Sequence, residues 1–149
     1  MKKKLFVMVF FAAAIASAQG VELGVTGGAG AFGDFGRNSS GGEVGAEACL
    51  FCSGTYALFG EYTHWFSGSS RTVNLGGGGI RIQGRSRVRP FIDIGAVGGE
   101  DQHAGIGAIV LGTGVRIPLG EHWYVRPQFR FYGSIHAAAI GSVGIGYRF

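Results

Sequence analysis

The chain has 149 residues, of which 30 are glycine and only 3 are proline, and thirteen Lys and Arg residues outnumber nine Asp and Glu residues. The glycines follow no three-residue period and are interleaved with Val, Ile, Phe and Tyr, which excludes a collagen-like or Ser/Gln-rich disordered chain. All three lysines lie at positions 2–4, so ten arginines accompany nine acids in the rest of the chain. This near balance gives no support for nucleic-acid binding.

The first 18 residues have the form of a secretory signal peptide. Three lysines precede an apolar stretch from Leu5 to Ile15, and Ala16-Ser17-Ala18 has the small-x-small form that signal peptidase cuts. A membrane-anchoring helix is the alternative, but the stretch is shorter than the roughly 20 residues that span a bilayer. We therefore predict that residues 1–18 are removed and that residues 19–149 form one exported domain.

The rest of the chain divides into eight segments in which apolar residues alternate with small or polar ones. The segments cover residues 21–32, 43–51, 56–66, 72–83, 88–97, 106–117, 123–132 and 137–149. Each is close to or above the roughly 9–11 residues that a tilted membrane strand needs. Turn-like residues separate the segments, and the Gly- and Ser-rich stretch 33–42 is predicted to be a loop.

The alternation places charged and apolar side chains on opposite faces of the predicted strands, because successive side chains of a strand point to opposite sides. Ile92 and Ile94 oppose Asp93, for example, and Phe129 opposes Arg130. The charged residues on the non-apolar face are Glu43, Glu47, Glu61, Asp93, Arg89, Arg116, Arg126, Arg130 and Arg148. Charges enclosed in an interior must be paired, and both signs occur here in near balance. The sequence therefore predicts a barrel whose interior holds an ionic network.

Segment 72–83 departs from this pattern. Val73 and Leu75 differ in parity from Ile80 and Ile82, and the glycine run 76–79 lies between the two pairs. A β-bulge in the glycine run would bring both pairs to the same face. The register of this strand stays open at this point.

Cys49-Leu50-Phe51-Cys52 is a CxxC motif at the end of the second segment. A thioredoxin-like redox role needs a βαβ setting, which the pattern lacks, and a zinc site needs two further ligands at suitable spacing. In an exported chain, a local disulfide between Cys49 and Cys52 is favoured over two free thiols. Both states stay open at this point.

Two further features are assigned structural roles. Residues 28–33 match GxGxxG literally, but no helical pattern follows them, so a phosphate group would find no helix terminus. Six aromatic residues near strand ends are predicted to form girdles at the two lipid–water boundaries. These six are Trp65, Trp123, Tyr124, Tyr132, Tyr147 and Phe149.

The end of the chain carries the strongest family resemblance. Val143, Ile145, Tyr147 and Phe149 alternate with small or charged residues up to the last position, and Arg-Pro pairs open the segments near residues 89 and 126. This pattern resembles the eight-stranded outer-membrane β-barrels of Gram-negative bacteria, the OmpA/OmpX type. The C-terminal alternation of this chain is similar to the signal by which the assembly machinery recognises outer-membrane proteins of that family.

The resemblance implies an all-β, eight-stranded, antiparallel transmembrane barrel in the outer membrane, with both termini in the periplasm. Its implied partners are membrane lipid and, during biogenesis, the assembly machinery. We expect a monomer without cofactor, metal or nucleic acid. An eight-stranded interior is wide enough only for side chains or one small ligand, so a wide pore is not expected.

The function predicted on this basis is structural and non-catalytic. A narrow porin-like channel is one alternative, and a soluble exported barrel that encloses an apolar ligand is another. Certain lipid A deacylases resemble this architecture and carry a His-x-Ser pair on a late strand. Here His136 is followed two residues later by Ala138, so deacylase chemistry is not expected.

Overall fold

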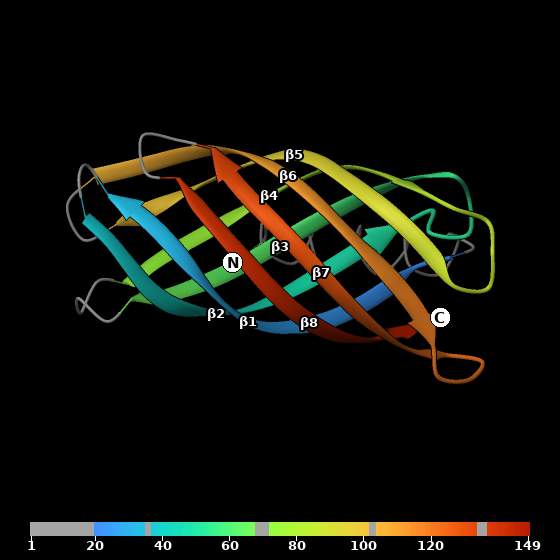
Figure 1. Cartoon of the computed structure of the whole chain (residues 1–149). Coiled ribbons are helices and arrows are strands. Elements are labelled where there is room, and N and C mark those ends of the chain that lie inside the picture. Colours follow the sequence, from blue (N-terminus) through green and yellow to red (C-terminus); the bar gives the residue numbers. More distant parts are fainter. Residues whose placement is uncertain (1–19, 35–36, 68–71, 102–103, 134–136) are drawn as a thin grey trace, which may run out of the picture.

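Eight antiparallel strands close into a barrel in the computed structural model (Figure 1). The strands are β1 (Glu22–Asp34), β2 (Arg37–Leu50), β3 (Tyr56–Ser67), β4 (Thr72–Gln83), β5 (Arg89–Asp101), β6 (Ala104–Pro118), β7 (Trp123–Gly133) and β8 (Ala138–Arg148). Each strand pairs with the next along the chain, and β8 pairs with β1, which closes the barrel. The predicted fold class and number of strands are confirmed.

The structure describes residues 20–34, 37–67, 72–101, 104–133 and 137–149. The predicted signal peptide, residues 1–18, lies outside these described residues. Within them, no helix has the length and apolar character that a membrane-crossing helix needs.

The barrel has two unlike ends. At the turn end, residues 51–55, 84–88 and 119–122 connect strands, and β1 begins where β8 ends. The C-terminus lies at this end (Figure 1). At the opposite end, here called the loop end, the other four connections lie between β1 and β2, β3 and β4, β5 and β6, and β7 and β8.

The prediction of a loop at residues 33–42 is wrong. The β1–β2 ladder continues from Gly30↔Gly41 to Asp34↔Arg37, so every described residue of this stretch belongs to a strand. Its small residues suggested a loop, but ladder hydrogen bonds join backbone groups and need no particular side chain. The β5–β6 ladder likewise extends to Asp101↔Ala104.

Large apolar side chains cover the outside of the barrel, and charged side chains lie inside. Ile92 and Ile109 are 54% and 62% exposed, whereas Asp93 and Arg126 are 0% and 1% exposed. The outward-facing set also includes Leu23, Val25, Val44, Leu58, Ile80, Ile82, Ile94, Leu111, Phe129, Phe131, Val143 and Ile145. This distribution is the reverse of that in a water-soluble protein.

The register of β4, which the sequence left open, is regular and contains no bulge. The ladder of β4 with β3 runs without a break from Tyr56↔Ile82 to Phe66↔Thr72, and its ladder with β5 is equally regular. Leu75 therefore points inward and is 1% exposed. The glycine run serves close strand approach, because a Cβ at Gly79 would lie only 2.1 Å from the carbonyl oxygen of Ile94.

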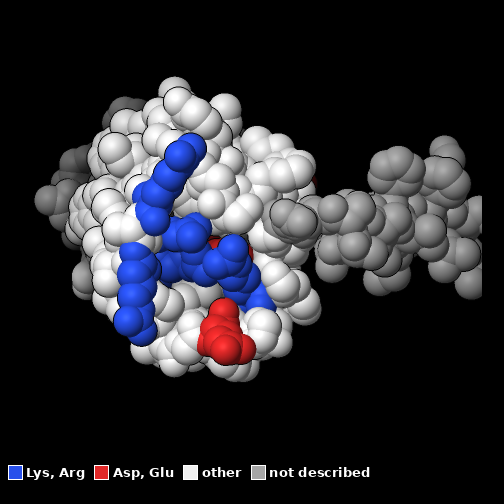
Figure 2. All heavy atoms as spheres, turned by 90° about the vertical axis from the view of Figure 1, so that its right-hand side faces the viewer, with Lys and Arg blue, Asp and Glu red and all other residues white. Residues whose placement is uncertain are grey.

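The predicted aromatic girdle is half correct. Trp65, Tyr124 and Tyr132 are buried inside the barrel, so their assignment to a girdle is wrong. The other three residues form a cluster at the turn end. The ring of Tyr147 meets those of Trp123 and Phe149 edge to face, with ring centres 5.2 and 5.1 Å apart. Basic side chains gather over the same end, where acidic ones occupy little of the surface (Figure 2).

Candidate functional site

A disulfide closes the interior at the turn end. Cys49 and Cys52 are bonded to each other, and both are buried. The backbone nitrogen of Cys52 donates to the carbonyl oxygen of Gly20 at 2.8 Å, and Gln83 Nε2 donates to the carbonyl oxygen of Cys52 at 2.7 Å. Phe51 adopts a left-handed φ of 61°, which reverses the chain so that the turn folds over the interior.

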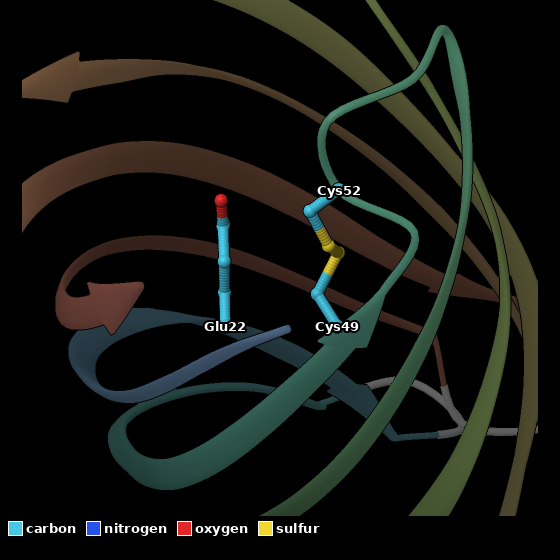
Figure 3. Close-up of side chains that lie close together, drawn as sticks. All are labelled: Glu22, Cys49 and Cys52. Atoms are coloured by element: carbon cyan, nitrogen blue, oxygen red, sulfur yellow. A yellow bond between two sulfur atoms is a disulfide. The ribbon is translucent and has the colours of Figure 1, made fainter. Parts of the chain in front are cut away.

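Glu22 lies beside this disulfide (Figure 3). Its carboxylate and the two sulfur atoms lie within 4.8 Å of one another, a grouping that sequence spacing did not reveal. Zinc binds cysteine as thiolate, whereas these sulfur atoms are bonded together. Glu22 also pairs with Arg116 at 2.6 Å. The arrangement thus closes the barrel and does not form a metal centre.

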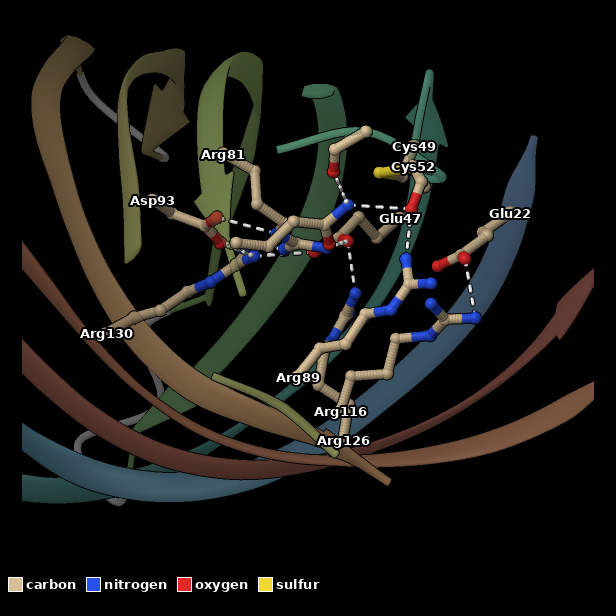
Figure 4. Close-up of a disulfide and its surroundings, with 12 residues drawn as sticks. Glu22, Glu47, Cys49, Cys52, Arg81, Arg89, Asp93, Arg116, Arg126 and Arg130 are labelled. Atoms are coloured by element: carbon tan, nitrogen blue, oxygen red, sulfur yellow. Dashed lines mark hydrogen bonds and ion pairs between the residues drawn. A yellow bond between two sulfur atoms is a disulfide. The ribbon is translucent and has the colours of Figure 1, made fainter. Parts of the chain in front are cut away.

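The centre of the interior holds an ionic network around Glu47 (Figure 4). Arg81 Nη1 lies 2.9 Å from one carboxylate oxygen of Glu47, and Arg126 pairs with that same oxygen. Arg130 Nη2 lies 2.6 Å from the other oxygen. Arginines from β4 and β7 thereby converge on one carboxylate of β2.

Two further carboxylates complete this network. Asp93 on β5 accepts from Arg81 Nε at 2.7 Å and from Arg81 Nη2 at 2.8 Å, a bidentate pair. Glu61 on β3 pairs with Arg130. We call Glu47, Glu61, Asp93, Arg81, Arg126 and Arg130 the central network. It contains three carboxylates and three guanidinium groups, so its formal charge is balanced.

Aromatic rings shield the arginines of the network. The guanidinium carbon of Arg81 lies 4.2 Å from the centre of the Phe91 ring and 5.6 Å from that of Phe59. Arg130 also lies 5.6 Å from the Phe59 ring. Guanidinium groups interact favourably with ring faces, especially away from water. The polar interior is therefore packed with paired charges and rings, although within the described part of the chain Arg126 Nε and Arg130 Nε are buried without a hydrogen-bond partner.

Not all residues predicted for the ionic network take part in it. Glu43 lies next to Ser142 and Trp65, further toward the loop end. Arg89 Nη1 donates to the carbonyl oxygen of Cys52 at 2.9 Å. Arg148, the last residue of β8, lies at the turn end, where its charge acts on Glu22.

Two buried charged residues of the interior, Arg81 and Glu22, were not predicted. Arg81 was not assigned because the parity of segment 72–83 was left open. Glu22 was not assigned, although it has the parity opposite to the outward-facing Leu23 and Val25. That parity was the signal available in the sequence.

The loop half of the interior is mostly apolar, although the carboxylate of Glu43 is buried there beside Trp65. Its buried cluster, here called the apolar plug, consists of Trp65, Leu75, Val97, Ala108, Val110, Tyr132, Ala138 and Ile140. Trp65 and Tyr132 meet edge to face, with ring centres 4.7 Å apart. The Tyr132 hydroxyl donates to Glu61 at 3.4 Å, which joins the plug to the central network.

The fold is that of small eight-stranded antiparallel barrels, a fold that solved outer-membrane proteins share. No protein-family model and no curated protein matches the sequence. The likeness to known proteins therefore rests on solved structures alone.

Among those structures is Neisserial surface protein A, with a TM-score of 0.71 and 14% identity over 89% of this chain and 98% of that chain. The N-terminal barrel of Pseudomonas aeruginosa OprF is similar, with a TM-score of 0.65 and 15% identity over 89% and 98% of the two chains. At such identities the likeness concerns the fold.

The outer-membrane enzyme PagL has the same fold, with a TM-score of 0.55 and 12% identity over 83% of this chain and 97% of that one. In this chain, His136 lies outside the described residues, and Ala138 is buried within the apolar plug. Ser142 also points inward and accepts a hydrogen bond from Gln128 Nε2 at 3.1 Å.

Proposed function

We propose that the protein is an integral outer-membrane barrel with a structural, non-catalytic role. The observation that carries this proposal is the reversed distribution of side chains. Val25, Ile94 and Phe129 are 58%, 51% and 50% exposed, whereas the arginines and carboxylates of the central network are buried. In a membrane, the surrounding hydrocarbon would remove these apolar side chains from contact with water.

In this proposal the barrel spans the membrane with its turn end in the periplasm and its loop end outside the cell. The protein is exported by the signal peptide of residues 1–18. Val143, Ile145, Tyr147 and Phe149 serve as the signal for the assembly machinery. All four have the parity that points outward, and three of them are 57%, 47% and 60% exposed in chain order, with Tyr147 half-buried. The protein acts as a monomer whose principal partner is lipid.

The filled interior supports a barrel that does not conduct ions. The charges of the central network are paired with one another. The members of the apolar plug offer an ion only the Tyr132 hydroxyl and the Trp65 indole, and the carboxylate of Glu43 lies beside Trp65. An ion that enters the plug would lose most of its hydration, which is unfavourable. We therefore favour a structural barrel over the narrow porin-like channel.

Membrane insertion is tested by extraction and by labelling from the lipid phase. We expect the protein to need detergent for extraction and to change gel mobility on heating. A photoactivatable lipid probe should label Ile94 and Phe129, which face outward, and not the adjacent inward residues Asp93 and Gln128. Labelling of the inward pair, or extraction by salt alone, would support a soluble barrel instead.

The closed interior is tested by planar-bilayer recording of the reconstituted barrel. We expect no conductance steps from wild-type protein. As a matched control, the triple variant Trp65→Ala, Leu75→Ala and Tyr132→Ala should show more leakage, since it removes the bulk of the plug. Stable conductance by wild-type protein would establish the channel and contradict this part of the proposal.

A further inference from the structure

The turn end carries five arginines that we call the arginine face: Arg85, Arg87, Arg89, Arg116 and Arg148. Arg85 and Arg87 are exposed in the connection between β4 and β5. Arg89 opens β5, Arg116 lies near the end of β6, and Arg148 ends β8. Basic side chains extend from the middle of this end toward its edge (Figure 2).

This face has more positive charge than its own carboxylates neutralise. Glu22 is buried against Arg116, and Glu121 is the exposed acid of the connection between β7 and β8. Among the described residues, neither Arg85 nor Arg89 has a carboxylate partner. Arg85 Nε donates to Thr55 Oγ1 at 2.9 Å, and Arg89 donates to the carbonyl oxygen of Cys52.

The arginines also repel one another. The charges of Arg89 and Arg148 both act unfavourably on that of Arg116. Like charges held close together lower the stability of the folded protein unless an anion approaches them. The arginine face is therefore an incomplete electrostatic arrangement that an external anion would complete.

The outer surface indicates which anion lies at this level. Trp123 and Phe149 are 52% and 60% exposed at the turn end, and Tyr56 is 70% exposed where β3 begins. Trp and Tyr favour the boundary between hydrocarbon and headgroups. Arg85 and Arg87 lie in the connection beyond the strand ends, where lipid phosphates would be. Guanidinium groups bind phosphate oxygens in bidentate fashion.

We propose that the arginine face binds the phosphate headgroups of anionic phospholipids in the leaflet at the turn end. This inference rests on the proposed membrane insertion of the barrel. It goes further by assigning a lipid class and by naming the two exposed arginines, Arg85 and Arg87, as the main contacts. These two residues lie outside the strands, so their replacement leaves the barrel wall unchanged.

Native mass spectrometry of the detergent-solubilised protein tests the proposal. Equal amounts of phosphatidylglycerol and phosphatidylethanolamine with identical acyl chains are added, and the lipid retained by the folded barrel is counted. We expect preferential retention of phosphatidylglycerol. In the double variant Arg85→Gln, Arg87→Gln this preference should fall about thirtyfold, given the typical contribution of each arginine near an anionic membrane surface.

Two matched variants separate charge from other effects. Arg85→Lys, Arg87→Lys keeps the charge and should retain most of the preference. Glu121→Gln removes an acid from the same end and should strengthen it. Heat-modifiable gel mobility, measured on each variant, confirms that the barrel is folded.

Equal retention of the two lipids, or a preference that survives the double glutamine variant, would overturn the proposal. Complete displacement of phosphatidylglycerol by millimolar inorganic phosphate would also overturn it, because the ligand would then be a soluble anion. In each of these cases a folded barrel that needs detergent still supports the proposed function. A protein that stays soluble without detergent contradicts the proposed function itself.

Discussion

The turn half of the interior is held by ion pairs among Glu47, Arg81 and Arg126, whereas the loop half is held by packing of Leu75, Val110 and Tyr132. Both halves fill the same narrow barrel, but charge pairing stabilises one and apolar packing stabilises the other. Removing one charge leaves its partners unpaired, while removing one methyl group leaves a small cavity. The comparison teaches that an eight-stranded wall accepts either kind of filling, provided that the filling is complete. Four substitutions test this contrast.

The largest effect is expected for Glu47→Gln. This change leaves Arg81, Arg126 and Arg130 without their shared carboxylate, and breaking a buried ion pair costs about 3–5 kcal/mol. Urea titration of the refolded barrel should therefore show a large loss in the free energy of unfolding. Glu100→Gln, at an exposed site of β5, is the control and should change stability by less than about 0.5 kcal/mol. Similar values for both variants would mean that the network contributes little.

A somewhat smaller loss is expected for Leu75→Ala in the apolar plug. The new cavity should cost about 2–4 kcal/mol, because Leu75 is fully buried among side chains of neighbouring strands. Leu75→Met keeps the volume and should cost less than about 1.5 kcal/mol in the same titration. Equal losses for the two variants would argue against tight packing in this half.

A moderate loss is expected when the disulfide is removed. The double variant Cys49→Ala, Cys52→Ala opens a very short covalent loop, for which chain entropy predicts about 2 kcal/mol. Dithiothreitol should lower the urea midpoint of wild-type protein to that of the variant and leave the variant unchanged. If reduction of the disulfide in the unfolded wild-type protein leaves its urea midpoint unchanged, the disulfide does not stabilise the turn.

The smallest effect is expected at the boundary between the halves. Ser142→Ala removes the acceptor of the hydrogen bond from Gln128, a loss of about 1 kcal/mol. Combining it with Gln128→Ala in a double-mutant cycle measures the coupling between the two side chains. Strict additivity of the two changes would show that this contact is energetically neutral.

Alternation along the chain was sufficient to predict eight strands and the direction of most outward residues. Parity is a local property, and Ile92, Asp93 and Ile94 display it without reference to any other strand. The strand ends were harder to predict, because the Gly- and Ser-rich stretch 33–42 has the composition of a loop but the backbone pairing of a hairpin.

The apolar plug was not predicted because its members come from six strands, β3 to β8. Trp65 shares the parity of the inward-facing Glu61 in the same strand, so its direction was available from local alternation. Leu75 and Arg81 share one parity of β4, which the mixed apolar pattern of that segment left undecided. Their direction follows from the register of the whole strand.

The central network has a consequence for how such a barrel is made. Arg81 on β4 and Asp93 on β5 neutralise each other, but Glu47 on β2 and Glu61 on β3 are balanced only when Arg126 and Arg130 of β7 arrive. A single hairpin inserted into hydrocarbon would carry unpaired charged side chains, which is energetically unfavourable. In the proposed membrane insertion, entry and closure of the wall therefore proceed together, and the sheet stays away from lipid until the seventh strand has joined.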